Sequence, residues 1–334
     1  MTRYPAGELV TLTIEGTSLK NNTLGDPTTR ACPVYVPRGS DGAGLPLLID
    51  LAAYTSSGLA HIAWKNFGEN LPKRIDRLIA TEKMKPAVIA MPDCFTSLGG
   101  NQYLNNPVLG NWEDFLIADL LPAVEGRFDC GGPGRRGLFG KSSGAYGALV
   151  NAMRHPDTWS AAACHAGDMG FDLVYGPELP ALLRHLERHD RSPTRFLDAF
   201  AHKDRPSGHD ITALMMLAMA VSYDPDPAAP YGVRLPVDPN TCERLSKHWQ
   251  AWLAWDPITL AAKHMDDLKS LDGLWIDCGV NDEYNLLYGA RRLHRALKAE
   301  GVAHVYDEFD GTHSGIDYRL DESLPFLTEA LTPS

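Results

Sequence analysis

The sequence predicts an α/β fold, in which a mostly parallel central sheet carries helices on both faces. Two observations support this. Short, continuous apolar runs, typical of strands covered on both faces, stand at residues 45–51, 88–91 and 274–278. Helical patterns alternate with them along the chain, and that alternation favours parallel strands joined by helices.

The N-terminal elements predict an antiparallel edge on this sheet. Residues 9–14 alternate apolar and polar side chains, as a half-buried strand does. Turn-forming residues follow at 21–27, and a second strand is expected at 31–36. Because a short turn joins these two strands, we expect them to pair antiparallel.

The middle of the chain predicts two helices and a short strand before the first motif. Apolar side chains recur at helical spacing in residues 71–81 and 112–128, and 137–139 is a short apolar strand. After residue 260 the same rhythm resumes, with expected elements at 274–278 (strand), 286–300 (helix), 302–309 (strand) and 324–331 (helix).

The segment of residues 171–260 interrupts the alternation. It holds 10 of the 24 prolines, and helix-like patterns stand at 179–188, 211–222 and 241–255. Because strands of the sheet flank it on both sides, we interpret it as a helical lid inserted into a single domain of residues 1–334.

Composition excludes several classes of protein. The hydrophobic fraction of 44% and charged fraction of 22% are those of a globular chain. A net charge of −11 with no basic run disfavours binding to nucleic acid or to an anionic membrane surface. The longest apolar run, 211–221, is about half the length of a membrane span.

The expected location is the cytoplasm. The first residues lack the apolar stretch of a signal peptide. The six cysteines are scattered, with no C-x-x-C pair, which favours free thiols in a reducing compartment over a disulfide framework.

The strongest motif is the pentapeptide of residues 140–144, Gly-Lys-Ser-Ser-Gly, placed between the strand at 137–139 and a helix expected at 145–153. G-x-S-x-G in this context predicts a sharp turn that presents Ser142 as a nucleophile. Glycines are needed because neighbours two residues away have no room for a Cβ atom. The turn also directs the Ser143 N–H, at the start of the helix, toward a developing oxyanion.

Two other interpretations of this motif are open. Gly-Lys-Ser also ends a P-loop, but that motif needs glycine at position 135, which is Arg135, and its strand would precede the first glycine. A chance match in a glycine-rich chain is the second alternative. The residues that follow later in the chain argue against it.

A nucleophilic serine on this fold needs an acid and a histidine, in that order along the chain. Asp282 follows the expected strand 274–278, and His313 follows the last strand, 302–309. The carboxyl ends of parallel strands share one edge of a sheet, so Ser142, Asp282 and His313 should converge. Asp310 and Glu283 remain alternative acids.

With these residues the chain resembles α/β-hydrolases of the esterase D type, which include S-formylglutathione hydrolases, enterochelin-esterase-like and feruloyl-esterase-like enzymes, and mycolyltransferases. The resemblance covers most of the chain and is most specific at 140–147 (GKSSGAYG) and 311–313 (GTH). It implies Ser142 as nucleophile, Asp282 as acid and His313 as base. It implies neither a metal nor a cofactor.

One departure from the family concerns the oxyanion hole. Many members carry His-Gly after the strand at 45–51, where this chain has Ala52 and Ala53. We expect the backbone N–H groups of Tyr54 and Ser143 to be the donors. Alanine does not easily reach the angles that glycine allows, so the loop is expected to differ in shape.

Candidate substrate-lining residues are Tyr103, Trp112, Met215 and Met219. For the two methionines, core packing under the lid is the alternative, and for the two aromatics it is ordinary surface packing. His185 and His189 have the i, i+4 spacing of a metal pair but stand among charges, so a solvated helix face is expected.

The sequence therefore predicts a serine esterase that cleaves a small-molecule ester or thioester through an acyl-enzyme. An acyltransferase with the same triad and a non-catalytic binding protein on this scaffold are the alternatives. The ester and the oligomeric state stay open.

Overall fold

The fold is built on one large sheet. The computed structural model describes residues 4–332, in which eight strands pair in the order β1-β2-β4-β3-β7-β8-β9-β10 and a small ribbon joins β5 to β6. The strands are β1 (Glu8–Glu15), β2 (Thr29–Val36), β3 (Leu47–Leu51), β4 (Val88–Ala90), β5 (Asn105–Asn106), β6 (Gly110–Asn111), β7 (Arg136–Lys141), β8 (Ala161–His165), β9 (Gly273–Gly279) and β10 (Val305–Phe309).

The predicted sheet is confirmed. β1 pairs antiparallel with β2, and β2 pairs antiparallel with β4. Every further neighbour, from β4 to β10, pairs parallel. The carboxyl ends of six parallel strands therefore lie along one edge, which is where ligands bind in open α/β sheets.

Strand β8 was not predicted from the sequence. Its residues begin with three alanines, a type that is depleted in strands and favours helices. The strand lies between β7 and β9, and α5 and α14 pack on its two faces. Small side chains let both helices approach closely, so tertiary packing overrides the local preference here.

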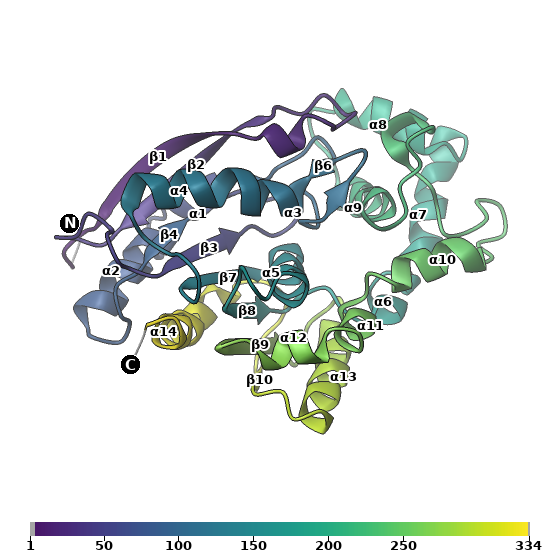
Figure 1. Ribbon diagram of the computed structural model, residues 1–334. Helices are drawn as coiled ribbons and strands as arrows, with labels where there is room; N and C mark the ends of the chain where they lie inside the picture. Colours follow the sequence, from purple (N-terminus) through teal and green to yellow (C-terminus); the bar gives the residue numbers. More distant parts are fainter. Residues whose placement is uncertain (1–3, 333–334) are drawn as a thin grey trace.

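Helices cover both faces of the sheet (Figure 1). One apolar cluster joins α2 (Leu71–Ala80) and α14 (Leu320–Ala330) to the first face. A larger cluster joins α4, α5 and α13 to the second face. The helices on the second face are α3 (Trp112–Asp114), η2 (Phe115–Leu120, a π-helical stretch), α4 (Leu121–Phe128), α5 (Ser143–Arg154) and α13 (Leu286–Ala299). The short helix α1 (Gly58–Ile62) follows β3, contacts α2 and packs Ile62 against the first cluster.

The expected insertion lies between β8 and β9. The helices up to residue 253 stand on the side toward which the β3 arrow points in Figure 1, at the carboxyl ends of the parallel strands, whereas the last two helices before β9 pack against α5. The expected helix 241–255 begins only at Ser246, because residues 237 and 244 form a bridge ahead of it. The helices between β8 and β9 are α6 (Phe171–Val174), α7 (Leu179–Leu186), α8 (Pro193–Ala201), α9 (Gly208–Tyr223), α10 (Ser246–Leu253), α11 (Pro257–Ala261) and α12 (Met265–Lys269).

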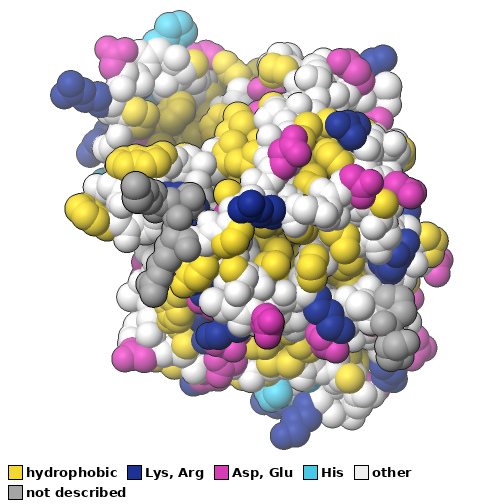
Figure 2. Space-filling model, turned by 90° about the vertical axis from the view of Figure 1, so that its left-hand side faces the viewer, with side chains coloured by type: hydrophobic (Ala, Val, Ile, Leu, Met, Phe, Trp, Pro, Cys, Tyr) yellow, Lys and Arg dark blue, Asp and Glu magenta, His cyan; other side chains and the backbone are white. Residues whose placement is uncertain are grey.

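The surface and the cysteines agree with the composition. On the face shown in Figure 2, Lys/Arg and Asp/Glu side chains are interspersed among apolar ones. None of the helices in residues 4–332 is long and apolar enough to cross a bilayer. All six cysteines are free, and all but the half-buried Cys242 are buried.

Candidate active site

Ser142 stands on a sharp turn between β7 and α5. Its backbone angles, φ 54° and ψ −124°, lie in a region that L-residues rarely adopt. The turn is held by its own N–H, which donates to the His165 carbonyl at 3.0 Å, and by the Tyr146 N–H, which donates to the Ser142 carbonyl at 2.9 Å. A strained backbone persists only where surrounding structure enforces it.

The glycines on either side of Ser142 are required by packing. A Cβ atom on Gly144 would overlap the Leu51 carbonyl oxygen, and one on Gly140 would lie 2.6 Å from the same oxygen. The end of β3 therefore presses directly against the turn. This is the steric reason that the sequence motif predicted.

His313 and Asp282 form a hydrogen-bonded pair. The His313 Nδ1 lies 2.8 Å from the Asp282 Oδ2, and both side chains are buried. The other carboxylate oxygen accepts the Tyr284 N–H at 2.9 Å, so the carboxylate is fixed. With its proton on Nδ1, the imidazole leaves Nε2 free to accept one. The Tyr284 ring stands edge-on to the imidazole, with centroids 4.8 Å apart.

The alternative acids are engaged elsewhere. Glu283 accepts the backbone N–H of His313 at 2.9 Å rather than its ring. Asp310 accepts from Asn281 at 3.3 Å. Asp277 bonds to His165 at 2.7 Å, in a buried network with other side chains of that region. The structure thus brings Asp282, and not these three, to the ring of His313.

Ser142, Asp282 and His313 follow β7, β9 and β10, and therefore stand at one edge of the sheet. Within residues 4–332, the Ser142 Oγ makes no hydrogen bond of 3.5 Å or less. Catalytic hydrogen bonds are often long before substrate binds.

A hydrogen bond from Tyr103 holds the loop that follows β3. The Tyr103 hydroxyl donates to the Ala52 carbonyl at 2.6 Å. Neither Ala53 nor Tyr54 has a positive φ, and the left-handed conformation falls on Thr55, with φ 63°. The Tyr54 side chain turns away, where its hydroxyl donates to the Leu98 carbonyl at 2.7 Å. Of the Tyr54 donors, the backbone N–H is therefore the remaining candidate for an oxyanion donor.

A buried polar cluster beside Ser142 was missed by sequence reasoning. Asp168 Oδ2 accepts from the Tyr175 hydroxyl at 2.9 Å and from the Ser143 hydroxyl at 3.3 Å. The Gln102 amide donates to the Ser143 hydroxyl at 2.9 Å. Burial raises the pKa of Asp168, although the Tyr175 hydrogen bond and a charged His313 oppose the rise. Its position three residues after β8, at the carboxyl edge, is the signal that could have found it.

The four candidate substrate-lining residues are buried or half-buried. Trp112 packs edge-on against Phe115 and bonds to a nearby carbonyl, inside the apolar cluster of the second face. Tyr103 is 2% exposed and faces the loop after β3. Met219 contacts the Gln102 amide at 2.9 Å, whereas Met215 is half-buried on the same helix. Contact of any of them with a substrate stays a prediction.

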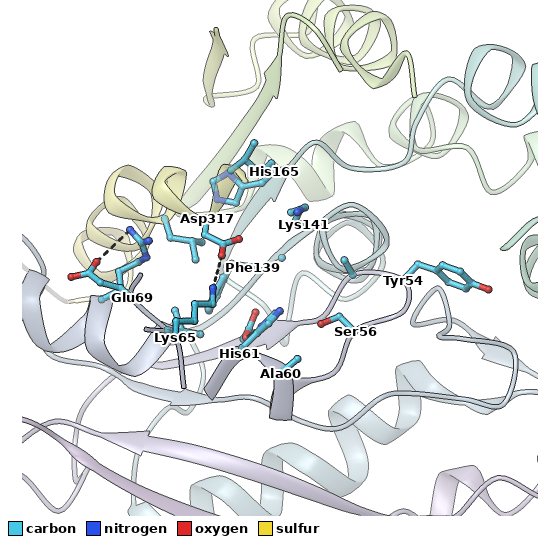
Figure 3. Close-up of a pocket in the computed structure, with 17 residues that line it drawn as sticks. Tyr54, Ser56, Ala60, His61, Lys65, Glu69, Phe139, Lys141, His165 and Asp317 are labelled. Carbon is cyan, nitrogen blue, oxygen red and sulfur yellow. Dashed lines mark hydrogen bonds and ion pairs between the residues drawn. The ribbon is translucent and has the colours of Figure 1, made fainter. Parts of the chain in front are cut away.

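The structure also contains a cavity of about 370 Å³ that the sequence did not predict. It lies at the carboxyl end of β7, between α2 and the segment 316–320, and Ser142, Asp282 and His313 are not among its lining residues. Figure 3 shows Lys65 and Asp317 paired at its centre, with His61 below them and Lys141 beside His165. We call it the Lys141 pocket; its polar lining is Asp50, Ser56, His61, Lys65, Glu69, Arg74, Lys141, His165 and Asp317.

His185 and His189 do not form a solvated face, contrary to the expectation. The His185 ring is largely buried, bonds to Asp210 at 3.1 Å and packs edge-on against Phe196, as the His189 ring also does. The reason is tertiary: α8 and α9 fold back over this helix. Nowhere in residues 4–332 do three or more His, Cys, Asp or Glu side chains form a group able to hold a metal ion.

Comparison with known proteins places this geometry in a family. A family model described as "Putative esterase" matches residues 28–321. A segment of 99 residues is 37% identical to Esterase Rv1288 of Mycobacterium tuberculosis, covering 28% of this chain and only 21% of that protein. Two solved structures similar over the whole chain are a ferulic acid esterase (TM-score 0.59, 18% identity, 98% of this chain and 99% of that chain) and an S-formylglutathione hydrolase from Agrobacterium tumefaciens (TM-score 0.58, 18% identity, 98% and 96%). These two likenesses show the fold, which is that of the α/β-hydrolases.

Proposed function

The chain belongs to the esterase family whose model it matches, and from that premise we propose that it hydrolyses small-molecule carboxylic esters through an acyl-enzyme on Ser142. Thioesters fall within the same chemistry. The observation that carries the proposal is the enforced turn at Ser142, on the sheet edge that also carries the His313–Asp282 pair.

In the proposed reaction the Ser142 hydroxyl attacks the ester carbonyl carbon while His313 Nε2 takes its proton. Asp282 holds the imidazole orientation and stabilises the imidazolium that forms. The tetrahedral intermediate collapses, His313 returns the proton to the leaving alcohol, and an acyl-enzyme remains. Water, deprotonated by His313, then releases the acid and regenerates Ser142.

The oxyanion is assigned to two backbone N–H groups, those of Tyr54 and Ser143. Ser143 is the first residue of α5, and first-turn N–H groups have no partner within their helix. The positive end of the helix dipole acts in the same direction. Losing one such donor costs roughly 3–4 kcal/mol of activation free energy in comparable sites.

Three further assignments complete the proposal. Residues 171–260 act as a lid over the carboxyl edge, where their helices stand (Figure 1). The partner is a small-molecule ester, and we propose no role in binding nucleic acid. The free thiols favour a reducing compartment, so we place the activity in the cytoplasm.

The test uses p-nitrophenyl acetate hydrolysis and labelling by a fluorophosphonate probe, on the wild type and three variants. Ser142→Ala should abolish both readouts while leaving the urea unfolding midpoint close to that of the wild type. Asp282→Asn should lower kcat by about 10³-fold or more. Asp310→Asn, the matched control, should stay near wild type.

Each other outcome has a defined meaning. Hydrolysis that persists in Ser142→Ala would refute the nucleophile. An unlabelled wild-type serine would favour the non-catalytic binding protein. Transfer of the acetyl group to added alcohols in preference to water would instead identify an acyltransferase.

A further inference from the structure

The charges around the Lys141 pocket are almost fully paired. Lys65 Nζ lies 3.0 Å from the Asp317 carboxylate, and His61 Nδ1 bonds to buried Asp50. His165 is held by Asp277 and by the Ser323 hydroxyl. Arg74 and Glu69 are joined to each other and to Arg77 and Asp321.

Lys141 is the exception. Within residues 4–332, its ammonium group has neither an ion pair nor a hydrogen bond, while every other charged residue that lines the pocket has one. It is half-buried at the end of β7. Its charge acts on Asp317 only at longer range. The lining therefore offers one ammonium group that has no direct partner and is desolvated in part, and such a group favours an anion of single charge.

A second donor faces the same space. The His61 ring uses Nδ1 for Asp50, so its Nε2 is not engaged by that pair. The negative charge of Asp50 raises the pKa of His61, against the effect of burial, which increases the fraction of the ring that carries a proton on Nε2.

The remaining wall is apolar. Leu71, Phe139 and Ile316 line the pocket and are nearly fully buried, and Leu320 adds to them. Pockets that hold small ligands combine such a wall with a few placed polar groups, and begin at about 300 Å³. A cavity of about 370 Å³ accommodates a small ring or a short chain.

We propose that the Lys141 pocket binds a small monocarboxylate with an apolar body, its carboxylate on Lys141 Nζ and its body against Phe139, Leu71 and Ile316. A neutral ligand would leave the ammonium group unpaired. A cationic ligand would be repelled by the charge of the ammonium group. A dianionic phosphate would bring two negative charges to a single ammonium group and would also lie near the carboxylates of the lining.

The pocket is next to, but separate from, the proposed catalytic residues. Lys141 directly precedes Ser142, and Ala53 and Tyr54 contribute to the wall. Binding there is therefore a property beyond the proposed esterase activity and does not depend on it.

The test measures binding of benzoate by isothermal titration calorimetry, with benzamide as the uncharged counterpart. The wild type should bind benzoate with a Kd of about 1 mM or tighter, and benzamide at least tenfold more weakly. Lys141→Met should weaken benzoate at least about tenfold, and Lys141→Arg should restore most of it. Lys83→Met, which removes an exposed lysine away from the pocket, should leave the Kd unchanged.

Location and independence need two further measurements. In crystals soaked with 4-iodobenzoate, the anomalous signal of iodine should lie among Phe139, Leu71 and Ile316. Ser142→Ala should bind benzoate as the wild type does, so a loss of esterase activity and a loss of binding are distinguishable. No benzoate binding by the wild type, equal binding by the folded Lys141→Met variant, or iodine outside the pocket would each overturn the proposal.

Discussion

Replacing Tyr103 with phenylalanine removes a hydroxyl that donates a 2.6 Å hydrogen bond to the Ala52 carbonyl. This contact holds the loop whose next residues lead to the Tyr54 N–H. The tyrosine ring would remain in place, because it packs against Gly147 and is 2% exposed. The substitution therefore frees the loop without opening a cavity.

The structure allows the magnitude to be worked out. The Ala52 carbonyl accepts no other hydrogen bond within residues 4–332, and Ala52 is buried. An unsatisfied buried acceptor costs about 1–3 kcal/mol, so we expect the free energy of unfolding to fall by about that amount. The Tyr54 N–H, the proposed oxyanion donor, shifts but is not removed, so the loss in kcat should be smaller than for deletion of a donor. We expect about tenfold, or about 1.4 kcal/mol of activation free energy.

The assay combines urea unfolding with steady-state hydrolysis of p-nitrophenyl acetate. The unfolding midpoint should fall at an unchanged m-value, and kcat should fall more than KM changes. Tyr35→Phe is the matched control, because the Tyr35 hydroxyl is also buried and donates to Asp76 at 2.8 Å, in the apolar cluster of α2 and α14. It should lose stability and keep kcat. If both variants lose stability equally and both keep kcat, Tyr103 does not position the loop.

Two further predictions concern the sharp turn at Ser142 and the Lys141 pocket. Gly144→Ala should lower activity at least 100-fold or prevent folding, because its Cβ would overlap the Leu51 carbonyl. Gly126→Ala in α4, where the Cβ meets nothing within 4 Å, should be neutral or stabilising by up to about 1 kcal/mol; similar urea midpoints and activities for the two variants would contradict the steric argument. Asp50 raises the pKa of His61, so the stability contributed by this pair should be complete below the unfolded histidine pKa, about 6.5, and should disappear as pH rises through the folded value. The difference in unfolding free energy between wild type and His61→Gln should accordingly narrow as the pH rises above about 6.5, and a constant difference would contradict the pairing.

Much of the fold could be predicted because its signals are local. Buried parallel strands appear as short apolar runs in the sequence. The glycines on either side of Ser142 indicate by themselves that the turn has no room for a Cβ atom. Residues 112–128 were expected to form one helix, and they do, through a π-helical stretch. Strand β8 could not be predicted this way, because three alanines fit a strand only between two closely packed helices.

The site was predictable to the extent that it follows strand ends. The position of Asp282 and His313 after consecutive strands placed them on one edge, and the structure adds their 2.8 Å hydrogen bond. The Asp168 cluster and the Lys141 pocket were not predictable. Each consists of side chains from segments far apart in the chain, and no local sequence pattern indicates that these segments will be in contact.

The pairing of β8 with β9 joins Ala161 to Gly273, so the chain between them is closed into a loop of more than one hundred residues. The entropy of closing a loop grows only with the logarithm of its length, by about 0.6 kcal/mol for each doubling. Lengthening or shortening this segment therefore changes the free energy of folding little through loop closure alone. The segment is held in place by apolar contacts with the second face of the sheet, through residues such as Phe171 and Met216. A graft that preserves those contacts would exchange the rest of the segment while the strands that precede Ser142 and His313 stay in register.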